Sequence, residues 1–413
     1  MSKTSIYRAI NTDTFPETME ITFSGDSKRQ TLLYQKATWT VDGEERGLRY
    51  GENPDQQASL YRLINGNLSL GEVESISPGR HLASDIELLQ SGKHPGKINV
   101  TDADSALNIL RYLSATPATV IVKHNNPCGV AIGGTLAESY TKAFLADRIA
   151  AFGGAVAVNR ELDQETAEQI AESYSEVVVA PEYAPGTLEI LGRRKNLRIM
   201  RIANIGRLQE YVGTRVVEFS SLIDGGIVAQ WSQVPEVHSP SDFQIAHVAK
   251  NGADYTIARQ PTQSELADMY FGWLVEFGVT SNSVIYVKDG ATVGSGTGEQ
   301  DRVGVAEIAR DKAYRRLAER MAFDSYGQMF GELTEEQRAE VWARAADLRG
   351  GLRGSVMISD AFFPFTDGPL VGIREGISAI VQPGGAMRDH EVISLCNESG
   401  ITMVFTGQRS FRH

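Results

Sequence analysis

A lysine and a histidine stand side by side at Lys123 and His124, in the segment KHNNPCG. The segment follows ATVIV (118–122), an apolar β-branched run that predicts a buried strand. Polar residues directly after such a strand lie at its carboxyl end, where open α/β sheets place their ligands. A cation beside an imidazole at that edge could serve an acyl transfer. A solvated surface turn explains the same two residues, and the local pattern leaves this alternative open.

Two further segments carry groups that could bind an anion. LRYGENP places Arg49 and Tyr50 before Gly51, and Arg and Tyr can clamp a phosphate through charge-assisted hydrogen bonds. An ordinary surface turn explains this segment equally well. GSGTGEQDR precedes Arg302 and a helical stretch, so it could cradle an anion at a helix start. It lacks the lysine of a P-loop and the glycine spacing of a dinucleotide fingerprint.

The cysteine and histidine spacing disfavours zinc chemistry. The chain has two cysteines, Cys128 and Cys396, and no histidine or cysteine lies at zinc-ligand spacing from either. The paired signature of zinc deaminases is also missing from the sequence. Both thiols are most simply packing residues. His413 is the last residue, and it matters only if the preceding run ITMVFT (401–406) anchors the tail.

Composition sets the broad class. The chain has 413 residues with 42% hydrophobic and 22% charged side chains, which is typical of a soluble globular protein of two or three domains. No apolar run is long enough for a membrane span, and the opening segment lacks the apolar core of a signal peptide, so we expect a cytoplasmic location. A net charge of -12 disfavours nucleic-acid binding, although a few local cations suffice for a small anionic ligand.

Helices and strands alternate through most of the chain, which predicts an α/β fold with a largely parallel sheet. Capping patterns predict helices that begin after Thr135, Asp163, Thr262 and Thr334. Apolar runs predict strands at 176–181, 355–359, 377–382 and 401–406, and a strand pair around a turn at Asp289-Gly290. Weak periodicity over 203–260 places a boundary there, which divides the chain into α/β domains at 1–202 and 203–413.

A series of segments in one order resembles AICAR transformylase, the phosphoribosylaminoimidazolecarboxamide formyltransferase of purine synthesis. The segments are LRYGENPDQ, KHNNPCG, AFGG, EVVVAP, SNSV followed by GTGEQDR, SDAFFPF, QPGGAMRD and the ending RSFRH. The resemblance implies two subdomains of cytidine deaminase-like topology, with mixed sheets flanked by helices and without zinc. In that family an IMP cyclohydrolase domain usually precedes the transformylase. Without a match to it here, the resemblance implies a stand-alone formyltransferase with a possible separate IMP cyclohydrolase as partner.

The resemblance also implies roles for individual residues. Lys123 and His124 match the catalytic pair, and Asn126 matches the asparagine of the same loop. His413 matches a terminal histidine near the active site. Ser410 and Arg412 depart from the family's tail beside Arg409. Positions that contact the nucleotide match Arg49, Tyr50, Gly153, Glu176, Asn282, Arg302, Phe362 and Arg409.

The implied reaction moves a formyl group from 10-formyltetrahydrofolate to the 5-amino group of AICAR and yields formyl-AICAR for IMP biosynthesis. His124 would act as general base, and Lys123 would stabilise the oxyanion or donate a proton, without a catalytic metal. The resemblance implies a homodimer with active sites at its interface, and neither nucleic acid nor membrane as partner. Two alternatives remain: a catalytically inactive purine-nucleotide-binding protein, and another purine-related transferase or deaminase.

Overall fold

The computed structural model describes residues 10, 13–25, 28–65, 68–74 and 79–413. The chain forms two compact units: Met1–Ser114 with Gly153–Val234, and Ala115–Phe152 with Pro235–His413. The predicted division into 1–202 and 203–413 has other bounds and stays a prediction, because compactness does not test whether a segment folds alone. Residues 1–9, on which part of the signal-peptide expectation rests, lie outside the described residues.

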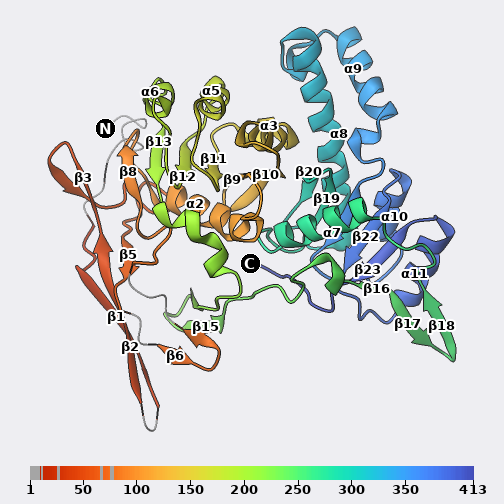
Figure 1. Ribbon diagram of the computed structural model, residues 1–413, viewed down its shortest axis with the longest axis horizontal. Helices are drawn as coiled ribbons and strands as arrows, with labels where there is room; N and C mark the ends of the chain where they lie inside the picture. Colours follow the sequence, from red (N-terminus) through yellow and green to blue (C-terminus); the bar gives the residue numbers. More distant parts are fainter. Residues whose placement is uncertain (1–9, 11–12, 26–27, 66–67, 75–78) are drawn as a thin grey trace. The chain divides into compact units, whose positions relative to one another are not determined.

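The first unit contains a mixed sheet with the strand order β8-β13-β12-β11 (Figure 1). Its strands are β8 (Glu87–Gln90), β11 (Ala155–Val158), β12 (Val177–Ala180) and β13 (Arg198–Arg201). β11, β12 and β13 run parallel, and β8 is antiparallel to β13. Helix α2 (Lys97–Leu110) packs against β11 and β12, while α5 (Gln164–Glu172) packs against α6 (Thr187–Leu191).

A smaller antiparallel sheet and three hairpins belong to the same unit. The sheet has the order β1-β2-β5, with β1 (Thr18–Ser24), β2 (Arg29–Ala37) and β5 (Leu60–Leu63). Leu32, Leu68 and Val73 form its small core. The hairpins are β3 (Trp39–Val41) with β4 (Glu44–Arg46), β6 (Ser69–Leu70) with β7 (Val73–Glu74), and β14 (Val217–Ser221) with β15 (Ile227–Trp231).

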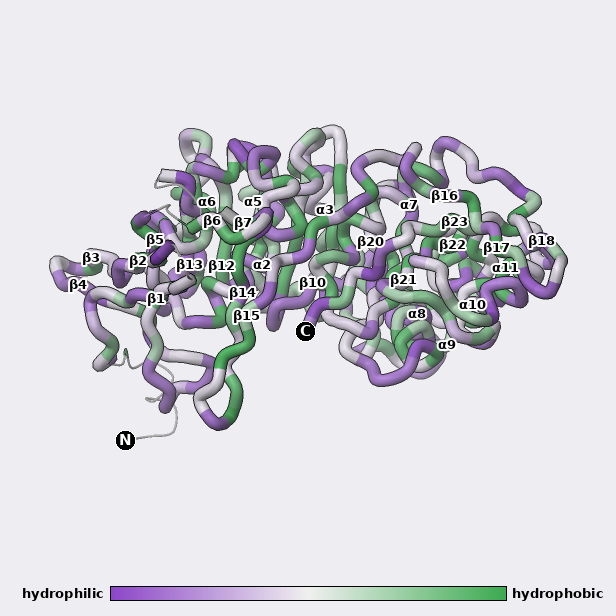
Figure 2. The backbone as a smooth tube through the Cα atoms, turned by 90° about the horizontal axis from the view of Figure 1, so that it is seen from below, coloured by the Kyte–Doolittle hydropathy of each residue, from purple (hydrophilic) through white to green (hydrophobic). Residues whose placement is uncertain are grey.

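The second unit contains a longer mixed sheet with the order β16-β23-β22-β21-β19-β20-β10-β9. Strands β21 (Val356–Ser359), β22 (Ala379–Gln382) and β23 (Thr402–Phe405) run parallel and are mostly apolar, with one polar residue at an end of each (Figure 2 colours the chain by hydropathy). The antiparallel strands are β9 (Ala118–Lys123), β10 (Asn126–Ile132), β16 (Gln244–Ile245), β19 (Val284–Lys288) and β20 (Ala291–Gly296). A hairpin of β17 (His247–Lys250) and β18 (Ala253–Thr256) lies outside this sheet.

Helices cover the strands of the second unit. α3 (Leu136–Ala146) packs on β9 and β10, and a Cβ at Gly129 in β10 would meet the Ala143 carbonyl oxygen at 1.9 Å, so this approach requires glycine. α7 (Gln263–Glu276) packs on β19 and β21, and α8 (Arg302–Tyr326) packs on β19 and β20. α9 (Glu335–Asp347) lies beside α8 (Figure 1). The remaining helices are α4 (Arg148–Ala151), α10 (Asp367–Arg374) and α11 (Asp389–Glu398).

The predicted α/β class, with mixed sheets flanked by helices, is confirmed, while the cytidine deaminase-like topology stays a prediction. The side chains of Thr135, Asp163, Thr262 and Thr334 cap the predicted helix starts. The expectation of a largely parallel sheet is wrong, because tight turns at 124–125 and 289–290 reverse the chain within the second unit. No helix among the described residues is both long and apolar enough to cross a membrane.

Candidate active site

The segment 123–129 contains a tight turn at His124 and Asn125 between two antiparallel strands. Lys123 ends β9 and pairs with Asn126, which begins β10. His124 and Asn125 form the turn with backbone φ angles of 57° and 61°. Positive φ at both central residues is typical of the two-residue hairpin turn that matches the twist of its strands. The sequence interpretation allowed a turn here but did not predict the hairpin, because neither central residue is glycine, although Asn and His enter this region more readily than most residues.

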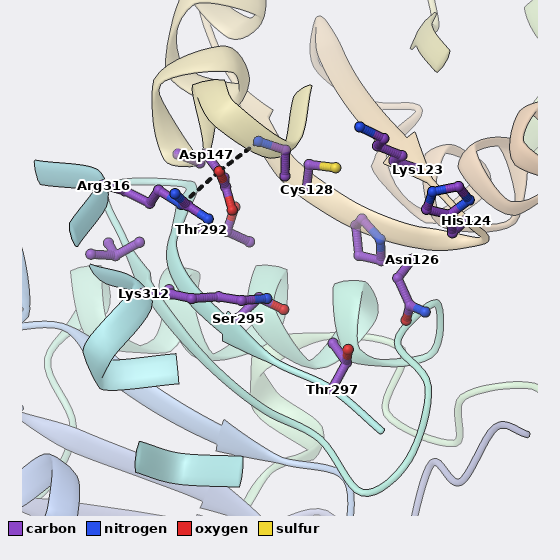
Figure 3. A pocket seen from close by; sticks show the side chains of 15 residues that line it. Lys123, His124, Asn126, Cys128, Asp147, Thr292, Ser295, Thr297, Lys312 and Arg316 are labelled. Atoms are coloured by element: carbon purple, nitrogen blue, oxygen red, sulfur yellow. Dashed lines mark hydrogen bonds and ion pairs between the residues drawn. The ribbon is translucent and has the colours of Figure 1, made fainter. Parts of the chain in front are cut away.

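Lys123 and His124 line a cleft of about 270 Å³ in the second unit (Figure 3). Lys123 is half-buried, and its Nζ donates a hydrogen bond to the carbonyl oxygen of Phe152 at 2.8 Å. The His124 side chain is exposed. A register shift between Pro127 and Gly129 places Cys128 in a bulge, and Cys128 also lines the cleft. The turn therefore presents an ammonium and an imidazole at an accessible position.

Asn126 connects this turn to the segment that precedes β19. Its Oδ1 accepts a hydrogen bond from the backbone N–H of Thr280 at 3.0 Å. Two residues further on, Asn282 Oδ1 accepts a hydrogen bond from Arg302 Nη2 at 2.7 Å. Asn282 Nδ2 donates to the Glu299 carbonyl oxygen at 3.0 Å, so the glycine-rich segment is held as well. The structure thus brings three predicted site residues, Asn126, Asn282 and Arg302, into one bonded network.

Asp360 is the fully buried acceptor of this network. Arg302 Nη1 and the Ser281 hydroxyl both donate to its carboxylate. The Arg302 side chain is only 10% exposed and the Asp360 side chain 0%. Because separating such a pair leaves a buried charge uncompensated, Asp360 fixes the direction of Arg302. The sequence interpretation did not single out Asp360, although it follows a buried strand, β21, just as His124 follows β9.

A second buried carboxyl lies beside this pair. Glu276, the last residue of α7, is 0% exposed, and its Oε1 accepts a hydrogen bond from the Ser283 hydroxyl at 2.7 Å. Its Oε2 has no hydrogen-bond partner among the described residues. Burial, and then the charge of Asp360, raise the pKa of Glu276 well above its ordinary value. The folded protein therefore favours the neutral form of this carboxyl group.

The C-terminal tail is bonded to the same network. The Ser410 N–H donates to the Asp360 carbonyl oxygen at 2.9 Å, and the Ser281 N–H donates to the Arg412 carbonyl oxygen at 2.9 Å. Arg409 lies with its guanidinium carbon 4.8 Å from the centre of the Phe411 ring. His413 is exposed, with its ring 6.0 Å from that of Phe411, and Phe362 is 41% exposed. The two departures from the family tail, Ser410 and Arg412, thus contribute backbone groups to the network.

The other predicted contacts belong to the first unit. Arg49 Nη2 donates to the Tyr50 hydroxyl at 2.8 Å, and Arg49 Nη1 donates to the Lys93 carbonyl oxygen at 2.9 Å. Gly153 has a φ of 76° and its N–H donates to the Tyr174 carbonyl oxygen at 2.7 Å. The Glu176 backbone N–H in turn donates to the Gly154 carbonyl oxygen at 3.0 Å.

Arg198 was not expected from the sequence and lies fully buried beside Glu176. Its Nη1 is 3.4 Å from Glu176 Oε2, and Asn99 Nδ2 donates to the same oxygen at 3.2 Å. Burial lowers the pKa of Arg198, and the charge of Glu176 opposes this shift. The Nε atoms of Arg49 and Arg198 are both buried without a hydrogen-bond partner among the described residues.

In the described part of the chain, no group of three or more His, Cys, Asp or Glu side chains gathers in a way that could hold a metal ion. The titratable residues that line the cleft are Lys123, His124, Cys128, Asp147, Lys312 and Arg316. The carboxylate of Asp147 is paired with Arg316 at 2.7 Å between Oδ1 and Nε.

Comparison with known proteins places this site in a family context. The model of the AICARFT/IMPCHase bienzyme family matches residues 3–312. A bifunctional purine biosynthesis protein PurH from Ruegeria sp. (strain TM1040) is 38% identical over 368 residues, covering 89% of this chain and 59% of the relative. The protein of the same name from Brucella abortus (strain S19) is 36% identical over 414 residues, covering 100% of this chain and 65% of the relative.

This chain therefore spans only about two thirds or less of the length of these relatives. The family match nevertheless extends over most of the chain and includes Lys123, His124 and Arg302. On these grounds, the chain belongs to the AICARFT/IMPCHase family.

Proposed function

We propose that this chain transfers a formyl group from 10-formyltetrahydrofolate to the 5-amino group of AICAR, giving formyl-AICAR in de novo purine biosynthesis. Membership of the AICARFT/IMPCHase family supports the proposal. The observation that carries it is the two-residue turn, which presents Lys123 and His124 together over a cleft. An amine whose lone pair is drawn into an aromatic ring is a weak nucleophile, so this pairing of a base with a cation suits the reaction.

His124 is the proposed general base, since an exposed imidazole can take a proton from the attacking amine, and such catalysis is typically worth about 100- to 10,000-fold. Lys123 either stabilises the oxyanion that forms on the formyl carbon or donates a proton toward the departing N10. A donor aimed at an oxyanion contributes about 3 to 4 kcal/mol. The hydrogen bond from Lys123 Nζ to the Phe152 carbonyl oxygen holds the ammonium group in a defined direction.

The remaining predicted residues are proposed to hold the nucleotide. Arg49 and Tyr50 are proposed for the phosphate, because the Arg49 guanidinium keeps a buried donor unsatisfied. Arg302 is preorganised by Asp360, which reduces the ordering cost of binding. Similar contacts are proposed for Asn126, Gly153, Glu176, Asn282, Phe362, Arg409 and His413.

We further propose the assembly implied by the resemblance, a cytoplasmic homodimer with active sites at the subunit interface. Sedimentation velocity tests the dimer. Analysis of the product, formyl-AICAR or IMP, shows which of these two compounds this chain forms.

The test of the reaction is a spectrophotometric assay of AICAR with 10-formyltetrahydrofolate. Replacing His124 or Lys123 by alanine should lower turnover by about a hundredfold or more. His247→Ala is the matched control, because His247 is an exposed histidine of the second unit in the β17–β18 hairpin. Circular dichroism checks that each variant keeps its fold.

Two results would argue against the assignment. A His124→Ala variant that works at the wild-type rate would remove His124 as the base. A wild-type protein that binds AICAR in calorimetry without formyl transfer would support the alternative of an inactive purine-nucleotide-binding protein.

A further inference from the structure

The cleft that contains Lys123 and His124 has a second group of polar residues, which the proposed reaction does not use. Lys312 and Arg316 lie on α8, Ser295 lies on β20, and Asp147 caps the start of α4. Lys312 and Arg316 are four residues apart on the helix, so their side chains project from the same face. Figure 3 shows them across the cleft from Lys123 and His124.

Two cations of α8 line the cleft, and of these two only Arg316 forms an ion pair among the described residues. The Arg316 and Asp147 side chains are 19% and 8% exposed, and they form an ion pair. Asp147 is further fixed by accepting a hydrogen bond from the Ala150 N–H at 2.9 Å. Lys312 is half-buried, and it neither donates a hydrogen bond nor joins an ion pair within the residues that the structure describes. Among the described residues, Lys312 therefore has no carboxylate as a counter-charge.

The same cleft is also lined by the hydroxyl group of Ser295. The Ser295 Oγ is buried and has no hydrogen-bond partner among the described residues. Figure 3 labels both Lys312 and Ser295 among the side chains that line the cleft. Buried polar groups are almost always paired, and leaving one unpaired costs about 1 to 3 kcal/mol. An ammonium and a hydroxyl can both donate, so an anionic group bound in the cleft would offer acceptor oxygens to both.

We propose that Lys312 and Ser295 bind an anionic oxygen of a substrate, a carboxylate or a phosphate, while the other end of the cleft presents Lys123 and His124. The inference rests on the proposed function for the identity of the substrates. The lining has three cations, Lys123, Lys312 and Arg316, against the single carboxylate of Asp147. This local excess of positive charge attracts anions to a chain whose net charge is -12.

The size of the cleft limits what can enter it. A volume of about 270 Å³ lies below the range of pockets that enclose a whole drug-sized ligand. It suits one charged group and its attachment. Both proposed substrates carry such a group: the formyl donor has glutamate carboxylates, and the nucleotide has a phosphate. The shared chemistry is an anionic oxygen, and binding measurements separate the two sources.

The experiment measures binding without turnover. Isothermal titration calorimetry with AICAR, pteroylmonoglutamate, pteroyltriglutamate and inorganic phosphate compares the wild type with Lys312→Met and Ser295→Ala. Lys312→Met keeps the apolar stem and removes the charge. Loss of a charge-assisted hydrogen bond should weaken the affected ligand by about ten- to a hundredfold. Lys312→Arg should restore most of the affinity, because it retains the cation.

Lys142→Met is the matched control, because Lys142 is a lysine of the same unit that is ion-paired with Glu138 at 2.7 Å on α3. It should bind every ligand as the wild type does. A loss confined to the pteroylglutamates supports the site and assigns it to the donor's carboxylates. A loss confined to AICAR and phosphate supports it and assigns it to the nucleotide's phosphate.

Unchanged affinities for all four ligands in both Lys312→Met and Ser295→Ala would overturn the site, and so would a wild type that binds none of them. If Lys312→Met fails to fold, Ser295→Ala decides alone. The outcome is independent of catalysis: a chain that binds these ligands through Lys312 but transfers no formyl group refutes the proposed function and leaves the anion site standing.

Discussion

Replacing Glu276 by glutamine should stabilise the second unit at neutral pH. Because burial and the charge of Asp360 raise the pKa of Glu276, the folded state keeps a proton that the unfolded chain releases above its ordinary pKa of 4.5. The free energy of unfolding then falls with rising pH by about 1.4 kcal/mol per pH unit until the folded-state pKa is reached. The loss accumulates over the whole interval between the ordinary pKa and the raised pKa of the folded state. Glutamine has the same shape as the protonated carboxyl group and can still accept the hydrogen bond from the Ser283 hydroxyl. Because glutamine does not titrate, the variant does not lose stability in this way as the pH rises.

The assay is urea denaturation of wild type and Glu276→Gln between about pH 5 and pH 8, followed by tryptophan fluorescence. Trp273 is fully buried on the same helix and reports on this region. The difference in unfolding free energy, variant minus wild type, should grow with pH. Below the ordinary pKa both states of the wild type hold the proton, so the difference there should be small.

Glu319→Gln is the matched control, because Glu319 is also buried, at 6% exposure, and accepts a hydrogen bond from the Phe330 N–H at 3.1 Å. Its replacement removes a buried carboxyl at a site away from Asp360. If the difference in unfolding free energy between Glu276→Gln and wild type stays constant across the pH range, the reasoning is refuted, since Glu276 would then titrate alike in the folded and unfolded states.

Two further substitutions test the network around Arg302. Asp360→Asn should lower the free energy of unfolding by about 3 to 5 kcal/mol, because Arg302 is left as a buried charge without its partner. Urea denaturation measures this loss, with Asp311→Asn as the control at an exposed aspartate. Asn126→Ala removes the acceptor of the Thr280 N–H. Thermal melts should therefore show a loss of about 1 kcal/mol in the free energy of unfolding, and the activity assay should show slower formyl transfer. A variant that loses stability but keeps full turnover would show that this bond does not position the turn.

The helix starts were predictable because their signals are local. Thr262 and Glu265 satisfy each other's backbone N–H groups three residues apart, and this pairing can be read directly from the sequence. The same holds for the turn at Asp289 and Gly290, where glycine accepts a positive φ. The turn at His124 and Asn125 uses the same backbone geometry without glycine, and it was therefore interpreted as an open loop. That missed reversal accounts for part of the error about a parallel sheet.

The site was less predictable because its bonds join distant segments. The Ser281 hydroxyl and the Asp360 carboxylate are 79 positions apart, and neither residue type signals catalysis by itself. Glu276 was not singled out from the sequence, since periodicity does not reveal that its carboxyl group is buried. The resemblance pointed to Asn282 and Arg302, whereas the role of Asp360, which accepts the hydrogen bond from Arg302, became evident only from the structure.

The β9–β10 turn also constrains insertions and deletions. Since side chains alternate between faces along a strand, one added residue between Lys123 and Asn126 would shift the pairing and reverse every side chain of β10. Asn126 would turn away from Thr280, and a residue with a Cβ would have to occupy the place of Gly129 against Ala143. Related chains that keep this chemistry should therefore preserve the number of residues in the turn.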